Sequence, residues 1–400
     1  PSRGLGDVYK RQSADGMPHA SVACVLRRQT PYRAFFMARR CVPTEAPPRL
    51  LHTSVLRHSA WAVPTGRAPP VAATDLQQAM AARTPIVCMT AFDAPTALAA
   101  RAAGTDICLV GDSLANVALG YSSTRALSLD AMIHHARTVR AAAHAPELQF
   151  DANCPRAPMV IVDMPFGTVI GSVDEAVRRV VRVVHETQAF GVKMEGSLEL
   201  LPLIEHLSSH GIAVMGHIGL QPQRYGDASG FRVQGGTAPS AMAILETAQA
   251  LERAGCFSFV LECVPARVGA AISERVGIPV IGIGAGPHTH GQVLVCTDIL
   301  GDVVSPAHVS AVLAGERAQP AGAAVDGATA VPVDGPAPPV DWPVPPKFVR
   351  TFGTNFGAQR IAALRAFANA VRARSFPDDA ESYKMKRDEW AALQQRLDTM

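Results

Sequence analysis

Acidic side chains stand at the ends of three successive apolar segments of the chain. Asp112 follows ICLVG, Asp163 follows MVIV, and Glu195 follows GVKM. If these segments are neighbouring parallel strands, about 4.8 Å apart, the three carboxylates repel one another unless a cation intervenes. Oxygen ligands without His or Cys favour Mg²⁺ over zinc. The alternative is that each carboxylate caps the following helix, which is the simplest interpretation of Asp93 before Ala94.

A basic side chain accompanies this acidic set. Lys193 lies two positions before Glu195, so both side chains leave a strand on the same face. We therefore expect the Lys193 ammonium to point into the same site, where it suits an anionic substrate such as a carboxylate. The alternative is a salt bridge that only balances the acidic charge.

Glu262 and His217 end two further apolar segments. Glu262 follows FSFVL, and burial at such a position raises the proton affinity of a carboxylate, as a general base requires. The alternative for Glu262 is an ion pair with Arg267. His217 follows IAVMG and could donate a hydrogen bond to a substrate, or could simply satisfy a backbone carbonyl.

These side chains need elements that bring strand ends together. Continuous apolar segments separated by helical patterns are typical of parallel strands buried on both faces. Their number, eight, predicts a TIM (β/α)8 barrel of the α/β class, in which chemistry gathers at the carboxyl ends of the strands. A doubly wound open sheet, which has the same local rhythm, is the alternative. The segments are 86–91, 107–111, 159–162, 191–194, 212–216, 257–261, 279–283 and 292–296.

The barrel is predicted as a single domain over residues 76–302. Residues 303–346 form a Pro/Ala-rich insert that cannot build a packed core. Residues 347–383 return to helix and complete the catalytic domain, and Ile361, Leu364, Ala368 and Val371 share one face. Residues 384–400 read as a charged helical tail.

The first part of the chain differs in composition from the barrel. Residues 1–12 contain SRGLGDVYKRQ, which is typical of translated adapter sequence, and we exclude them from the fold. Residues 13–75 are rich in Arg and poor in acids, the composition of a disordered mitochondrial transit peptide. This leader predicts delivery to the mitochondrial matrix. The alternative is a disordered basic tail.

Charge and hydropathy exclude several classes of protein. The 400 residues carry a formal net charge of +3, but residues 1–74 alone carry +8, which leaves −5 for the remainder. A slightly acidic folded part argues against a nucleic-acid partner. No apolar segment approaches the roughly 18 residues that a membrane span needs.

Six motifs follow one another along the chain. They are VGDS (110–113), VDMPFG (162–167), VKMEGS (192–197), GHIGLQPQ (216–223), LECVP (261–265) and IGIGAG (281–286). In this order they resemble the ketopantoate hydroxymethyltransferase family. The likeness covers roughly residues 76–302 and resumes from Pro346 to residue 383. It implies a TIM-barrel homo-oligomer that binds Mg²⁺ and transfers a one-carbon unit from 5,10-methylenetetrahydrofolate to the keto acid 3-methyl-2-oxobutanoate.

The resemblance also implies roles for individual residues. Glu262 would be the proton acceptor. Asp112 and Asp163 would hold the metal, with Glu195 at or next to its coordination shell. The implied contacts to the keto acid come from Asp112, Ser113, Asp163, Lys193 and His217. The loop 145–157 and the insert 303–346 are longer than in the compact bacterial pattern, but neither touches a motif.

Two competing interpretations remain at this level. One is a different Mg²⁺-dependent barrel that acts on α-keto acids, akin to the phosphoenolpyruvate mutase and isocitrate lyase group, because fold alone does not decide function. The lyases of that group carry a K-K-C-G-H loop, which this chain lacks. The other is a non-catalytic barrel kept for assembly or regulation, against which the intact acid, base and Lys positions argue.

Overall fold

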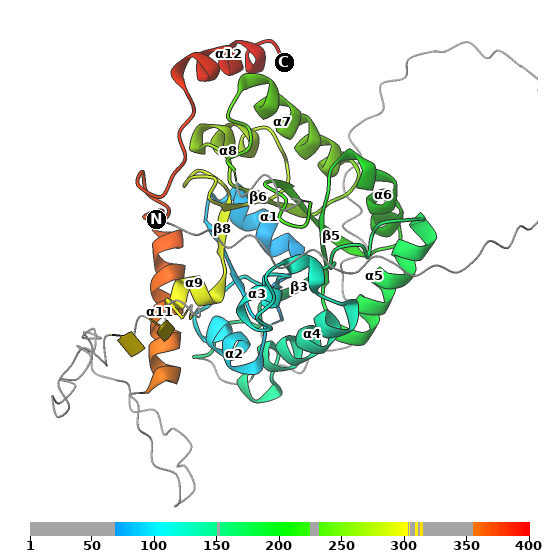
Figure 1. Ribbon diagram of the computed structural model, residues 1–400, viewed down its shortest axis with the longest axis vertical. Helices are drawn as coiled ribbons and strands as arrows, with labels where there is room; N and C mark the ends of the chain where they lie inside the picture. Colours follow the sequence, from blue (N-terminus) through cyan, green and yellow to red (C-terminus); the bar gives the residue numbers. More distant parts are fainter. Residues whose placement is uncertain are drawn as a thin grey trace, which may run out of the picture. The chain divides into compact units, whose positions relative to one another are not determined.

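Eight parallel strands close into a barrel in the computed structural model of this chain (Figure 1). Each strand pairs with its neighbours in sequence, and β8 pairs with β1, so the predicted barrel is confirmed and the open sheet is wrong. All eight predicted segments are strands. They are β1 (Ile86–Thr90), β2 (Ile107–Val110), β3 (Met159–Asp163), β4 (Gly191–Glu195), β5 (Ala213–Gly219), β6 (Ser258–Glu262), β7 (Val280–Ile283) and β8 (Gly291–Leu294).

The structure describes residues 69–149, 153–224, 232–302 and 355–400, with a few isolated positions between 304 and 314. The predicted segment 1–12, most of the leader 13–75 and nearly all of the insert 303–346 lie outside these residues. Helix α1 (Ala73–Ala81) begins within the predicted leader, and its Leu76 is buried with Val71 against the barrel strands, so the fold starts before residue 76.

The strands are apolar throughout because both of their faces are covered. Ile107 and Leu109 of β2 pack inside the barrel, whereas Cys108 and Val110 pack outward in the cluster that includes the helices. Alternation of this kind determines the direction of every strand residue. Continued to the strand ends, it turns Asp163, Lys193, Glu195, His217 and Glu262 toward the barrel axis.

Helices follow most strands and cover the outside of the barrel. One capping prediction is confirmed: the Asp93 carboxylate accepts from the backbone N–H of Thr96 at the start of α2. The remaining helices are α2 (Ala94–Ala102), α3 (Leu114–Val117), α4 (Leu129–Ala143), α5 (Val173–Thr187), α6 (Leu201–Ser209), α7 (Ala238–Arg253), α8 (Ala266–Ser273), α9 (Cys296–Leu300), α11 (Phe356–Arg372) and α12 (Arg387–Leu397), with short 3-10 turns at Thr124–Ala126, Pro146–Gln149 and Leu198–Leu200.

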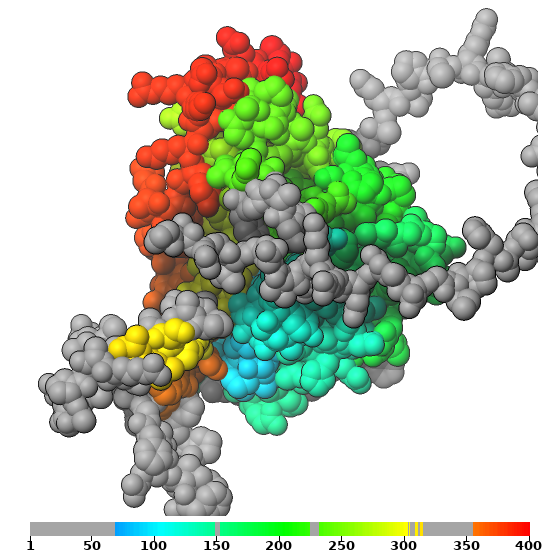
Figure 2. All heavy atoms as spheres, in the orientation of Figure 1, coloured from blue at the N-terminus to red at the C-terminus, as the bar shows by residue number. Residues whose placement is uncertain are grey.

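The C-terminal part of the chain returns to the barrel wall. Helix α11 packs on α2, α9 and β1 through the buried Leu364, Ala368 and Val371 and the partly buried Ile361, the four residues predicted to share its face. Helix α12 lies against α7, as Figure 2 shows, and buries Leu393 and Leu397. The charged tail is therefore helical, as predicted, but one side of it belongs to the core.

Arg101 of α2 is buried at 2 % exposure and holds the long loop 145–157 in place. Its guanidinium donates to the carbonyls of Ala143 at 2.9 Å and Leu148 at 2.8 Å, and more weakly to that of Pro155. A buried charge of this kind stabilises a fold only because its donors are satisfied.

We predict that Arg101→Met lowers the free energy of unfolding by about 3 kcal/mol, because charged hydrogen bonds are lost and buried carbonyls are left without donors. Denaturant titration of the full chain checks this. Arg182→Met, which removes an exposed arginine of α5, is the matched control and should leave stability nearly unchanged. Equal effects of the two substitutions would contradict the role given to Arg101.

Candidate active site

The carboxyl ends of β3 to β6 bring the predicted site residues together. In the strand register Asp163 lies beside Lys193, Glu195 beside His217, and Gly219 beside Glu262. Since these side chains all point toward the barrel axis, the four strand ends present three carboxylates, one ammonium and one imidazole to a common space. Five of the seven predicted site residues are therefore gathered by strand geometry alone.

Asp163 and Lys193 form a buried ion pair, with Nζ 2.5 Å from Oδ1. Burial raises the pKa of the Asp163 carboxyl, and the Lys193 ammonium opposes that rise. Burial disfavours the charged form of Lys193, but the Asp163 and Asp112 carboxylates outweigh it and raise the pKa of the ammonium. The salt bridge that the sequence offered as an alternative for Lys193 is therefore present, with Asp163 as its partner, and contact of Lys193 with a substrate stays a prediction.

Asp112 and Ser113 lie just beyond β2, above the Asp163 carboxylate. The backbone N–H of Asp112 donates to Asp163 Oδ2 at 3.0 Å. A Cβ placed on Gly111 would lie 3.1 Å from Ser113 Oγ and 3.7 Å from Asp163 Oδ2, so these two oxygens face the same small space. Ser113 therefore lies beside the Asp163–Lys193 ion pair, and its contact with a substrate stays a prediction.

The helix-cap alternative does not account for the three strand-end acids. Ser113 occupies the N-cap position of α3, Ser172 caps α5, and Ser197 stands before the turn Leu198–Leu200. Asp112, Asp163 and Glu195 occupy none of these positions, so their carboxylates are available to the site. Of the acids weighed as caps, Asp93 is the one that caps a helix.

Glu195 is buried and turned toward His217. Its Oε1 accepts from the backbone N–H of Arg224 at 3.2 Å, and its Oε2 lies 3.6 Å from His217 Nδ1. Burial raises the pKa of the Glu195 carboxyl to about 7, an effect that His217 and Lys193 partly oppose. Burial therefore outweighs the two neighbouring basic side chains at this position.

His217 joins Glu195 to Glu262. His217 Nε2 lies 3.0 Å from Glu262 Oε2, while the buried Nδ1 has no hydrogen-bond partner. Both alternatives weighed from the sequence are wrong: the imidazole contacts a carboxylate rather than a backbone carbonyl, and Arg267 stacks on Trp390 rather than pairing with Glu262. His217 therefore holds the Glu262 carboxylate beside the site.

Gly219 allows the chain to pass close to Glu262. Its φ is +88°, and a Cβ at this position would lie 2.2 Å from the Glu262 carbonyl oxygen. Leu220 N–H donates to that same oxygen at 2.9 Å. The backbone of Glu262 is thus held from the neighbouring strand, which restricts where its side chain can reach.

Gln223 is a further residue of this site, which no sequence pattern had predicted. Its Nε2 donates to Asp112 Oδ2 at 2.8 Å, although the two residues are far apart in the chain. The signal present in the sequence was the motif GHIGLQPQ, which ends at Gln223. Motif and spacing gave no reason to pair it with Asp112, because the contact depends on the path of the β5–α7 loop.

The donor set suits a hard divalent cation. Asp112, Asp163 and Glu195 supply three carboxylates against one ammonium, and oxygen donors favour Mg²⁺. Within the described part of the chain, however, no three His, Cys, Asp or Glu side chains gather as a ready metal site. That Asp112 and Asp163 hold Mg²⁺, with Glu195 at or next to its coordination shell, stays a prediction.

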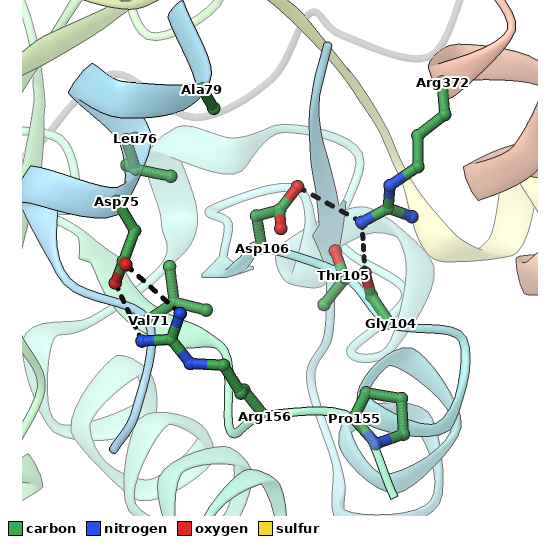
Figure 3. Close-up of a pocket in the computed structure, with 10 residues that line it drawn as sticks. All are labelled: Val71, Asp75, Leu76, Ala79, Gly104, Thr105, Asp106, Pro155, Arg156 and Arg372. Atoms are coloured by element: carbon green, nitrogen blue, oxygen red, sulfur yellow. Dashed lines mark hydrogen bonds and ion pairs between the residues drawn. The ribbon is translucent and has the colours of Figure 1, made fainter. Parts of the chain in front are cut away.

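A cavity of about 360 Å³ lies elsewhere, beside α1 and the segments that enter β2 and β3. Figure 3 shows its two ion pairs, Asp75 with Arg156 at 2.8 Å and Asp106 with Arg372 at 3.5 Å. None of the strand-end site residues lines it. Because β2 and β3 enter the barrel here, this cavity belongs to the end opposite the site.

Comparison with known proteins gives one consistent result. A 3-methyl-2-oxobutanoate hydroxymethyltransferase from Geobacillus kaustophilus is 37% identical over 322 residues, covering 80% of this chain and 97% of its own length. One from Deinococcus radiodurans is 50% identical over 218 residues, which cover 54% of this chain and 72% of that protein. The Arabidopsis thaliana protein named 3-methyl-2-oxobutanoate hydroxymethyltransferase 1, mitochondrial, is 43% identical over 239 residues, covering 60% and 65%.

Among solved structures, that of 2,3-dimethylmalate lyase superposes with a TM-score of 0.43 at 16% identity, covering 66% of this chain and 93% of the other. This similarity is too low to bear on function. The model of the family described as ketopantoate hydroxymethyltransferase matches residues 70–324, which include all eight strands. The chain therefore belongs to the ketopantoate hydroxymethyltransferase family.

Proposed function

We propose that this chain is an enzyme that converts 3-methyl-2-oxobutanoate to 2-dehydropantoate. The one-carbon unit would come from 5,10-methylenetetrahydrofolate, and water would supply the hydroxyl oxygen. The observation that carries the proposal is the pairing of Glu262 with His217 next to the Asp163–Lys193 ion pair on the inner face of the barrel. A base and an anion-binding cation beside each other suit proton removal from a keto acid.

The keto acid would bind over the Asp163–Lys193 ion pair. The Lys193 ammonium would neutralise part of the substrate carboxylate, and Ser113 Oγ would donate a hydrogen bond from the rim of the same space. Asp112 and Asp163 would hold Mg²⁺, with Glu195 at or next to its shell. Mg²⁺, when bound, supplies Lewis-acid stabilisation of the negative charge that develops on the keto oxygen.

Glu262 would remove the C3 proton of the keto acid. His217 supports this role because its Nε2–H can donate to Glu262 Oε2, which orients the carboxylate and leaves the other oxygen for the proton. The methylene carbon of the folate would gain a carbon–carbon bond from the C3 carbanion equivalent and a carbon–oxygen bond from water, while its two carbon–nitrogen bonds break. The two folate nitrogens would take up the proton removed by Glu262 and one proton from the water. No covalent protein nucleophile is needed.

The Glu262→Gln variant should still bind Mg²⁺ and the keto acid but should exchange the C3 proton at least about 100-fold more slowly, because an amide is a very weak base. NMR in deuterated water measures this exchange. Glu205→Gln is the control, since Glu205 is an exposed acid of α6. Normal exchange of the C3 proton in the Glu262 variant would refute the assignment of Glu262 as the base. Absence of this exchange in the native protein would favour a non-catalytic barrel.

Removing the charge at Asp163 should weaken the binding of keto acid and Mg²⁺ together. Asp163→Asn deprives the ion of a ligand and leaves Lys193 without its partner, so we expect both dissociation constants to rise by about tenfold or more. Isothermal titration calorimetry measures both. Asp130→Asn on the exposed surface of α4 is the control, and two unchanged constants at position 163 would contradict the metal site.

We further propose that the protein is a homo-oligomer of the mitochondrial matrix. The localisation is supported by the Arg-rich leader and by relatives in Oryza sativa and Arabidopsis thaliana whose names include the word mitochondrial.

A fluorescent protein fused after residue 75 should be imported into mitochondria, because the leader is cationic and the matrix is negative. A diffuse cytosolic signal would contradict the localisation, and a monomeric mass of the purified protein in solution would contradict the assembly.

A further inference from the structure

A tight turn follows β5 and lies across the carboxyl ends of its neighbours. We call residues Gln221–Arg224 the QPQR turn. It is closed by a hydrogen bond from Arg224 N–H to the Gln221 carbonyl at 3.0 Å. Pro222 stands at the second position, where its fixed φ suits such a turn. The two glutamine side chains that flank this proline are therefore held by a stiff piece of backbone.

One side of the QPQR turn binds backbone and Glu195. Gln221 Nε2 donates to the carbonyls of Gly196 at 3.0 Å and His217 at 3.2 Å. Arg224 N–H donates to Glu195 Oε1 at 3.2 Å. These contacts anchor the turn to the ends of β4 and β5.

Gln223 reaches from the same turn to the far side of the site. Its side chain is buried, and its Nε2 donates to Asp112 Oδ2 at 2.8 Å and to the Met164 carbonyl at 3.2 Å. Both partners are acceptors, so the amide nitrogen, rather than its oxygen, must face them. The turn thus connects β5 with the ends of β2 and β3 through one amide.

We propose that Gln223 is a positioning residue that orients the Asp112 carboxylate and thereby sets the affinity of the site for Mg²⁺. This inference rests on the proposed function. The amide occupies Oδ2 of Asp112 and leaves Oδ1 for a cation. The contact to the Met164 carbonyl, which directly follows Asp163, ties the same amide to the second carboxylate-bearing strand.

The chemistry of an amide suits this role better than a charged side chain would. Lys or Arg at position 223 would pair with Asp112 and compete with the ion, and Glu would add charge to a site already crowded with carboxylates. A neutral donor fixes the rotamer of Asp112 without changing the net charge. Groups that orient metal ligands in this manner commonly contribute 10–100-fold to metal affinity.

The test compares Gln223→Met with Gln78→Met in the full chain. Both replace an amide by a side chain of similar length, but Gln78 is exposed on α1, at the end of the barrel opposite the site. We expect calorimetry on the ligand-free protein to show Mg²⁺ binding weakened about tenfold by Gln223→Met and less than about twofold by Gln78→Met. The KM for keto acid should rise in the Gln223 variant by more than kcat falls.

A second variant guards against a folding defect. Gln223→Asn keeps the amide but shortens its reach, so it should weaken Mg²⁺ binding in the same direction while thermal unfolding stays near that of the native chain. In an Asp112→Asn background, Gln223→Met should have little further effect, because the residue acts through Asp112. Additive losses would show that Gln223 acts independently of Asp112 and would overturn the proposal.

Two failures can be told apart. If the native chain binds Mg²⁺ and Gln223→Met binds it equally well, or if both Met variants weaken binding alike, the positioning role is wrong and the proposed function stands. If the native chain does not bind Mg²⁺ at all, the metal part of the proposed function fails, and the role of Gln223 fails with it.

Discussion

The confinement of negative charge at one end of the barrel is the constraint on which the rest of the site depends. Asp163 and Glu195 are buried where β3 and β4 end, and Asp112 lies just above them. Carboxylates held in such surroundings are costly unless positive charge or hydrogen-bond donors reach them. The single ammonium of Lys193 cannot offset the charge of all three carboxylates. Burial raises the pKa of the Glu195 carboxyl to about 7.

Neutral hydrogen-bond donors and one imidazole contact these carboxylates and partly offset their negative charge. Backbone N–H groups of Asp112 and Arg224, the amide of Gln223 and the ring of His217 each face one carboxylate. None of these donors adds a permanent positive charge. The excess of carboxylate charge beside one ammonium is the feature that the proposed binding of a divalent ion and an anionic keto acid would use.

The two halves of the site differ in how far they could be predicted. The inward direction of Asp163, Lys193, Glu195 and Glu262 follows from the period of two in a strand, and it agrees with the division of the buried strand residues into an inner and an outer set. The partner of Glu262 did not follow. Arg267, close in sequence, was a reasonable candidate, but α8 turns it toward Trp390, and His217 from the neighbouring strand takes its place.

The amino-acid sequence by itself determined the eight strands, the barrel and the end at which the chemistry gathers, because apolar segments and strand alternation are local properties of the chain. Only the tertiary structure decided which polar groups meet. The contact of Gln223 with Asp112 depends on the turn after β5, that of His217 with Glu262 on the register of β5 and β6, and those of α11 and α12 on their packing against the barrel wall. Contacts of these kinds join residues that no spacing rule along the chain relates, so they can be known only once the chain is folded.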